Sequence, residues 1–312
     1  MRAGLALTAL VLAGPTQLPA RGQQPALPRT GFAIQAATGV VLVDPAGHVV
    51  RTLKGYTLRD DGVERAGQVE LRDASGHDFE LRAGRLAAVP RDSVTLPRGW
   101  SVQFSEGWSL QQGGHTVATF PATSHLELDS SGTFLSVVPR GGGATIVRDL
   151  RTGKLGHRPA GCRVGARVGA VEYDLCGSPF ATGKGSSIVR VDRSGTHVLA
   201  KTARGAAGWR ALVPGPAGSP LLAQWSGSCT VTAAYLVSRT SGELTPLRDR
   251  SARRVEGFGL GWIGTTPFAS LPRSTCSASA APPGIYAYDA TGRALLVYRL
   301  STRPGTVVRL WR

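Results

Sequence analysis

The chain contains little lysine, methionine or aromatic side chain. Only four of its 36 basic residues are Lys, it has a single Met, and Phe, Trp and Tyr make up 6% of its 312 residues. No run approaches the roughly 18 consecutive apolar residues of a membrane-spanning helix, and no helix-period segment with capping residues is found. With 41 Gly and 20 Pro in addition, these absences exclude a helical bundle, a coiled coil and a polytopic membrane protein.

The chain also lacks the sequence patterns of a metal site. The four cysteines, Cys162, Cys176, Cys229 and Cys276, form no C-x-x-C, no His stands at metal-ligand spacing, and no D-x-[DN]-x-[DN]-G loop occurs. We therefore expect neither a metal nor a cofactor. Four cysteines permit three pairings; we predict disulfides Cys162–Cys176, across a local strand pair, and Cys229–Cys276, with buried free thiols as the alternative.

The N-terminus resembles a secretory leader. Arg2 is followed by the nearly apolar run 5–13, which has the length of a signal-peptide hydrophobic region and is too short to span a bilayer. We predict a signal peptide and leader over residues 1–26 and a single domain over 27–312, which places the mature protein outside the cell or in its envelope. A disordered apolar N-terminus is the alternative.

A hairpin recurs along the chain. In each copy an alternating apolar run leads to a turn that ends in Gly, and a second alternating run follows; Asp at the start of most of these turns can accept backbone hydrogen bonds. The seven copies are residues 40–53, 69–81, 108–120, 145–155, 188–199, 235–244 and 285–297. Repeats of about 40–50 residues with several strands each are typical of β-propellers.

The later repeats contain two further strands before the hairpin, which gives four strands per unit. The first repeat lacks its inner strand, and residues 306–311 are a spare strand at the C-terminus. We predict an all-β fold, a single propeller of seven blades (six are possible) of four-stranded antiparallel sheets, closed by the C-terminal strand. Two β-sandwiches in series are the alternative. The charged segments 68–73 and 77–81 are expected to be outer, solvated strands.

Residues 126–155, LELDSSGTFLSVVPRGGGATIVRDLRTGKL, resemble the TolB-like and WD-repeat β-propeller superfamily. In that superfamily a D-x-x-G turn, an apolar strand, a loop and a D-L-x-T-G hairpin recur in each blade. The resemblance covers about residues 122–300 and implies an architecture without implying an activity. TolB has an additional N-terminal α/β domain, for which this chain has no room, so the lipoprotein partner of TolB is not expected here.

The basic charge is concentrated in the second half of the chain. Residues 1–149 contain 14 Lys and Arg against 13 Asp and Glu, and residues 150–312 contain 22 against 7. In a ring this predicts one strongly positive side, which favours an anionic partner such as a cell-wall polymer, a lipid surface or an acidic protein. A merely solvated basic face is the alternative. Nucleic acid is not expected, because the basic run 248–254 contains no aromatic residue. We expect a monomer.

The predicted topology assembles a candidate ligand-binding patch. Loops that join second to third strands leave a propeller on one face, and there they carry Arg140, Lys184 and Arg273, with Trp225 at a strand end. Cys229 and Cys276 belong to equivalent loops of adjacent blades, which is why we pair them. We predict that these four residues, Trp225 included, bind the ligand.

The sequence leaves two function classes open. The first, which we favour, is a non-catalytic binding scaffold at the cell surface. The second is a propeller hydrolase or lyase that uses Glu172 and Asp174 beside the central channel, where the inner strands otherwise consist of apolar and small residues (165–171 and 258–263). Five of the six histidines follow hairpin glycines and are expected in solvent; they are His48, His77, His115, His157 and His197.

Overall fold

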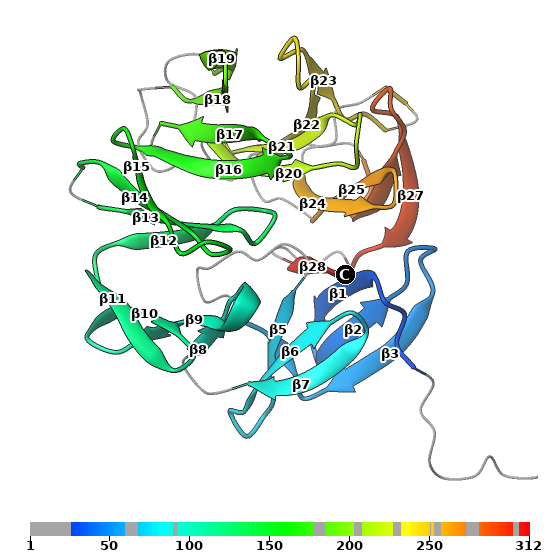
Figure 1. Cartoon of the computed structure of the whole chain (residues 1–312). Coiled ribbons are helices and arrows are strands. Elements are labelled where there is room, and N and C mark those ends of the chain that lie inside the picture. The colour runs from blue at the N-terminus through cyan, green and yellow to red at the C-terminus, as the bar shows by residue number, and fades with distance from the viewer. Residues whose placement is uncertain are drawn as a thin grey trace, which may run out of the picture.

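The computed structural model describes residues 26–59, 68–89, 93–140, 142–177, 185–202, 208–226, 232–249, 251–252, 257–272, 281–301 and 306–312. In these ranges seven four-stranded antiparallel sheets follow one another around a ring (Figure 1). The protein is therefore a seven-bladed β-propeller, as the hairpin repeat predicts. One 3-10 turn, Pro97–Gly99, is the helical structure of the described residues. None of them forms a helix with the length and apolar character needed to cross a bilayer.

The blades are numbered along the chain, and their strands are given from the inner to the outer edge. Blade 1 contains β28 (Val308–Trp311), β1 (Gly31–Ala36), β2 (Gly39–Val43) and β3 (Val49–Lys54). Blade 2 contains β4 (Thr57–Leu58), β5 (Val69–Arg72), β6 (Asp78–Arg82) and β7 (Arg85–Val89). Blade 3 contains β8 (Ser93–Thr95), β9 (Trp100–Phe104), β10 (Gly107–Gln112) and β11 (His115–Pro121).

The remaining blades follow the same order. Blade 4 contains β12 (His125–Leu128), β13 (Phe134–Val138), β14 (Thr145–Asp149) and β15 (Leu155–Arg158). Blade 5 contains β16 (Cys162–Val168), β17 (Val171–Cys176), β18 (Ser187–Asp192) and β19 (Gly195–Lys201). Blade 6 contains β20 (Trp209–Pro214), β21 (Leu221–Ser226), β22 (Thr232–Val237) and β23 (Leu244–Pro246). Blade 7 contains β24 (Phe258–Ile263), β25 (Thr266–Leu271), β26 (Gly284–Tyr288) and β27 (Ala294–Arg299).

The C-terminal strand completes the first blade. β28 pairs antiparallel with β1, with Trp311 opposite Gly31 and Val308 opposite Ile34. A side chain at residue 31 would meet the indole, since a Cβ there would lie 2.5 Å from ring atoms of Trp311. Trp311 is fully buried, and its Nε1 donates a hydrogen bond to the Pro28 carbonyl at 3.2 Å. The ring is thus closed by the spare strand that the sequence contains, and the C-terminus lies near its centre (Figure 1).

The Asp–Gly turns have the local structure that the sequence predicts. In blade 4 the buried Asp129 carboxylate accepts hydrogen bonds from the backbone N–H groups of Ser131 at 3.1 Å, Thr133 at 2.6 Å and Phe134 at 2.6 Å. Gly132 takes the positive φ of +67° that closes the turn. Because these backbone N–H groups occupy its carboxylate oxygens, the role of Asp129 is to stabilise the turn.

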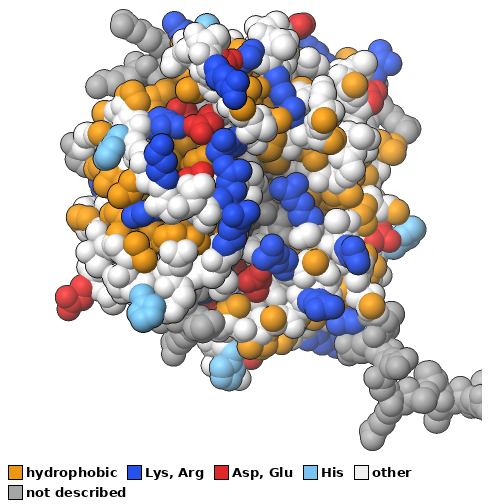
Figure 2. All heavy atoms as spheres, viewed as in Figure 1, with side chains coloured by type: hydrophobic (Ala, Val, Ile, Leu, Met, Phe, Trp, Pro, Cys, Tyr) orange, Lys and Arg blue, Asp and Glu red, His pale blue; other side chains and the backbone are white. Residues whose placement is uncertain are grey.

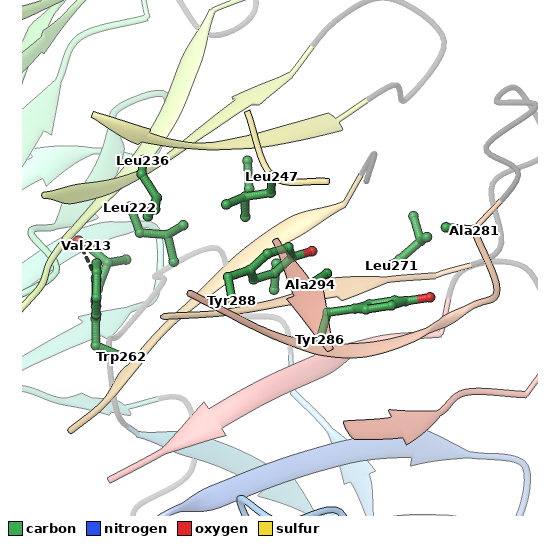
Figure 3. Packing of buried hydrophobic residues seen from close by; sticks show 12 residues of the cluster. Val213, Leu222, Leu236, Leu247, Trp262, Leu271, Ala281, Tyr286, Tyr288 and Ala294 are labelled. Atoms are coloured by element: carbon green, nitrogen blue, oxygen red, sulfur yellow. Dashed lines mark hydrogen bonds between the residues drawn. The ribbon is translucent and has the colours of Figure 1, made fainter. Parts of the chain in front are cut away.

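The hydrophobic core is divided among the interfaces between blades. Six clusters of buried apolar side chains each fill one interface: blades 1–2, 3–4, 4–5, 5–6, 6–7 and 7–1. Figure 3 shows the cluster of blades 6 and 7, in which Trp262 packs beside Val213 and Leu222. No such cluster of described residues joins blade 2 to blade 3.

The predicted position of the charged strands in blade 2 is wrong. Residues 68–73 and 77–81 correspond to β5 and β6, which are the second and third strands of the blade and not its outer strand. Val69, Leu71 and Leu81 are almost fully buried. Their alternation with charged residues gives each strand one apolar face, which packs against blade 1, and one charged face.

Candidate functional site

The structure describes only half of the predicted ligand patch. Arg140 is exposed in the loop that follows β13 and joins a second to a third strand. Trp225 lies near the end of β21, and its ring is half-buried against the cluster that fills the interface of blades 5 and 6. Lys184 and Arg273 lie outside the described residues, as do Cys229 and Cys276. The patch and the second disulfide therefore stay predictions.

The first predicted disulfide is present. Cys162 and Cys176 lie directly opposite each other on β16 and β17, and their sulfurs are bonded. The bond links the inner strand of blade 5 to its second strand at one end of the blade. Disulfides persist in oxidising compartments, so this one is typical of an exported protein.

Glu172 and Asp174 lie on a second strand, and the prediction that they belong to the inner edge of the ring is wrong. The inner strand β16 ends at Val168, and a turn at Gly169, with φ +60°, leads into β17. The two carboxylates face blade 4, where Arg158 of the outer strand β15 binds both. The Arg158 Nε lies 2.9 Å from Asp174 Oδ2, and its Nη2 forms an ion pair with Glu172.

Asp174 is the one carboxylate of this group with a strongly raised pKa. Burial raises its pKa to about 6, and the nearby Glu172 adds to the rise, while Arg158 opposes it. Such a value suits a general acid or base at neutral pH. However, the Asp174 side chain is only 4% exposed and Arg158 occupies one of its oxygens. The arrangement joins two blades and leaves the carboxylate little access to a substrate.

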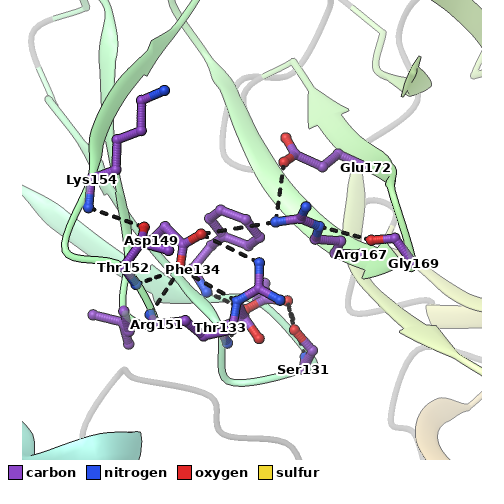
Figure 4. A network of polar contacts seen from close by, with 12 residues as sticks. Ser131, Thr133, Phe134, Asp149, Arg151, Thr152, Lys154, Arg167, Gly169 and Glu172 are labelled. Carbon is purple, nitrogen blue, oxygen red and sulfur yellow. Dashed lines mark hydrogen bonds and ion pairs between the residues drawn. The ribbon is translucent and has the colours of Figure 1, made fainter. Parts of the chain in front are cut away.

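Further ion pairs extend this contact between blades 4 and 5 (Figure 4). The Arg167 Nη1 lies 3.9 Å from Asp149 and 3.9 Å from Glu172, and its guanidinium stacks 5.4 Å from the centre of the Phe134 ring. Arg151 also binds Asp149, at 3.3 Å. The apolar cluster of this interface contains only Phe134, Val147 and Val164, so charged contacts supplement a small core.

A polar cluster on the inner strands was not predicted from the sequence. His125 Nε2 lies 2.9 Å from Glu127 on β12, and Glu127 forms an ion pair with Arg163 of β16. Arg163 Nη2 also donates hydrogen bonds to the carbonyls of Trp209, at 3.1 Å, and Arg210, at 3.2 Å, on β20. Burial would raise the pKa of Glu127, but Arg163 and His125 hold it below its usual value. The cluster thus ties three inner strands together.

One sequence signal could have located this cluster. His125 and Glu127 stand at i and i+2 on a predicted inner strand, so their side chains lie on one face. Because the predicted inner strands consist of apolar and small residues, the pattern did not single out this polar pair. The partner Arg163 could not be assigned, because its pairing depends on how neighbouring blades meet. The five histidines that follow hairpin glycines are exposed, as predicted.

No metal-binding group of three or more His, Cys, Asp or Glu side chains occurs among the described residues. Positive charge is more prominent than negative charge on the face that Figure 2 shows. There Lys and Arg side chains gather toward the middle of the ring and outnumber Asp and Glu.

No protein-family model and no curated protein matches the sequence. Solved propeller structures do resemble it. A prolyl endopeptidase matches with a TM-score of 0.52 and 11% identity over 91% of this chain and 50% of its own. An oligogalacturonate lyase from Vibrio parahaemolyticus matches with a TM-score of 0.51 and 10% identity over 88% of this chain and 86% of its own. The dihydro-heme d1 dehydrogenase NirN matches with a TM-score of 0.50 and 12% identity over 94% of this chain and 77% of its own.

These likenesses establish the fold alone. The chain spans half the length of the prolyl endopeptidase it matches. The three proteins carry different activities on similar rings, as is usual for common folds. The sequence resemblance to propellers is therefore confirmed at the level of the seven-bladed fold.

Proposed function

We propose that the protein is an exported, non-catalytic β-propeller scaffold of TolB-like type that binds an anionic partner at the cell surface. One observation carries the proposal. The described carboxylates whose positions come closest to those of a catalytic acid–base pair are each bound by an arginine. Glu172 and Asp174 are held by Arg158, and Glu127 by Arg163. An acid–base pair needs groups that are free to exchange protons with a substrate.

The charge and the disulfide support the same proposal. Residues 150–312 contain 22 Lys and Arg against 7 Asp and Glu, so cationic groups for an anionic partner are abundant. The Cys162–Cys176 bond and the leader-like residues 1–26 fit export. The patch of Arg140, Lys184, Trp225 and Arg273 is retained as one candidate contact surface.

A second candidate function is a hydrolase or lyase that uses Asp174 and Glu172. The pKa of about 6 for Asp174 favours it, because a group that titrates near neutral pH can both accept and donate a proton. The burial of Asp174 and its bond to Arg158 speak against it.

One experiment separates these functions. Purified full-length protein is titrated with dextran sulfate, polygalacturonate and neutral dextran at increasing NaCl, and the polymers are then analysed for cleavage. The scaffold predicts binding to both acidic polymers that weakens steeply with salt, without cleavage and without change in Asp174→Asn. Cleavage that Asp174→Asn abolishes would establish the enzyme, and equal binding to neutral dextran would exclude an electrostatic partner.

A further inference from the structure

The interface between blades 2 and 3 differs from the other six. On the blade 2 side, the register aligns Glu70 with Glu80, Glu80 with Ala87, and Arg82 with Arg85. Directly paired residues point to the same face of a sheet. The opposite face, which holds Leu71 and Leu81, packs against blade 1. The charged face is therefore directed at blade 3.

The face of blade 3 that is directed at blade 2 is polar and uncharged. The apolar residues of β9 and β10, among them Val102 and Leu110, pack against blade 4. The residues that alternate with them face blade 2, and the register aligns them in two rows. These residues are Ser93, Thr95, Ser101, Gln103, Ser109 and Gln111. Gln111 donates a hydrogen bond to Gln103 at 3.0 Å within this face. Both sides of the interface are thus hydrophilic.

The charges of blade 2 are separated along the length of β6. At the first residue of β6, the fully buried Asp78 carboxylate binds Arg59 at 2.8 Å and Arg72 at 2.7 Å. At the other end of β6, Arg82 lies opposite Arg85, and both are exposed. Neither their side chains nor that of Glu80 make a hydrogen bond or ion pair with the described part of the chain. The Asp78 charge is paired within the blade, and the charges at the far end of β6 are available.

The charges at this end of β6 surround an open groove of about 420 Å³, which we call the arginine groove. It is lined by Arg29, Glu80, Arg82, Ala83, Arg85 and Ala87. The turn Ala83–Gly84 brings Arg29 into the lining. A Cβ at Gly84, whose φ is +74°, would lie 2.6 Å from the Leu27 carbonyl, so the segment before β1 crosses directly over this turn. The groove thus presents three guanidinium groups from two separate segments of the chain.

We infer that the arginine groove binds an acidic glycan, and this inference rests on the proposed function as a binding scaffold. Guanidinium groups bind carboxylate and sulfate groups in a bidentate manner. Glu80, placed among three arginines, can accept hydrogen bonds from the sugar hydroxyls that lie between the anionic groups of such a glycan. The lining contains no aromatic side chain on which a base could stack.

The test compares two double variants with the same change in charge. Arg82→Glu/Arg85→Glu alters the groove, and Arg193→Glu/Arg299→Glu alters two exposed arginines of blades 5 and 7. Binding of dextran sulfate and polygalacturonate is measured by titration, and thermal melting checks the fold. We expect the groove variant to bind either acidic polymer roughly 10- to 100-fold more weakly, and the control variant to lose less than about threefold. Arg82→Gln/Arg85→Gln, which adds no repulsion, should lose affinity to a smaller extent.

Each outcome is decisive. Equal losses in the groove and control variants, or none in either, would overturn the groove while leaving the anionic scaffold intact. If the wild-type protein binds neither acidic polymer, the proposed function itself fails. Tighter binding of a DNA duplex than of both acidic polymers at equal salt would overturn the glycan assignment. Loss with dextran sulfate alone assigns sulfate groups to the site, and loss with polygalacturonate alone assigns carboxylates.

Discussion

The burial of Asp174 in the contact between blades 4 and 5 has an energetic cost, which is expressed in its raised pKa. Its pKa in the folded protein is about 6, against 3.8 for the free side chain. Between these values the folded protein holds a proton that the unfolded chain releases, so the protonated carboxyl favours folding at low pH and this contribution is lost as pH rises through 6. The difference corresponds to about 3 kcal/mol at 1.36 kcal/mol per pKa unit.

We predict that Asp174→Asn removes this dependence. The free energy of unfolding is measured with urea between pH 4 and pH 8 for the wild type and the variant. The variant should gain stability relative to the wild type as pH rises, with the change centred between the two pKa values, because Asn carries no charge to desolvate. A difference between the two proteins that does not vary with pH would show that Asp174 titrates normally.

Arg158 is the residue on which both carboxylates depend. We predict that Arg158→Met costs about 3–5 kcal/mol, since it leaves a buried carboxylate without its cation. Adding Glu172→Gln and Asp174→Asn to Arg158→Met should recover much of this loss, because the uncompensated charges are then removed. The measurement is urea unfolding at pH 7. A loss below about 1 kcal/mol would mean that the pairs are effectively solvated.

The carboxylate pair itself was visible in the sequence, and its partner was not. Glu172 and Asp174 share a strand face through simple alternation. Arg158 reaches them from the preceding blade, 14 and 16 residues earlier in the chain, and that contact depends on how two sheets are placed in the ring. Local pattern therefore predicted the groups but assigned them to the channel when they in fact join two blades.

At the scale of the element, hairpins were predictable because their turns are local. Asp accepts the backbone N–H groups ahead of it and Gly takes the positive φ, and neither requires distant residues. The strands of blade 2 were misassigned for a related reason. The number of charged residues in β5 and β6 suggests exposed strands, but burial follows the alternation of these residues with apolar ones, which leaves Leu71 and Leu81 on an apolar face.

The closing strand gives a prediction for a single element. Trp311→Ala should cost about 3–5 kcal/mol, as other buried Trp and Phe truncations do, because the indole fills the space above Gly31 and packs with the core of blades 1 and 2. Leu295→Ala on β27, where the side chain is 51% exposed, is the matched control and should change stability by less than about 0.5–1 kcal/mol. Urea unfolding measures both. Equal effects would mean that β28 contributes little to closure.

At the scale of the whole molecule, the number of blades and the closure by the last strand followed from the repeat. The difference between the polar interface of blades 2 and 3 and the six apolar interfaces did not follow from the repeat, because each interface is formed by two faces that belong to different repeats. The sequence nonetheless contains the signal. The polar face of β5 and β6 and the polar face of β9 and β10 are adjacent in blade order, so the two can only meet each other.

This difference predicts that mutations on neighbouring residues of one strand have different effects. In blade 3, Leu110→Ala removes a side chain from the core shared with blade 4 and should cost about 2–5 kcal/mol. Ser109→Ala, one residue earlier and directed at blade 2, should change stability by less than about 0.5 kcal/mol. Leu81→Ala and Glu80→Ala form the same comparison in blade 2, where Leu81 is fully buried against blade 1.

Urea unfolding of the four variants shows whether the polar interface between blades 2 and 3 contributes to stability as the six apolar interfaces do. If the polar interface contributes to stability as the apolar ones do, Ser109→Ala and Glu80→Ala will lower the free energy of unfolding by more than about 1 kcal/mol each. If they do not, blades 2 and 3 are held next to each other by the rest of the ring. The charged residues of the arginine groove, Glu80 among them, can then be substituted at little cost in stability, so a loss of ligand binding in such variants reports on the groove itself.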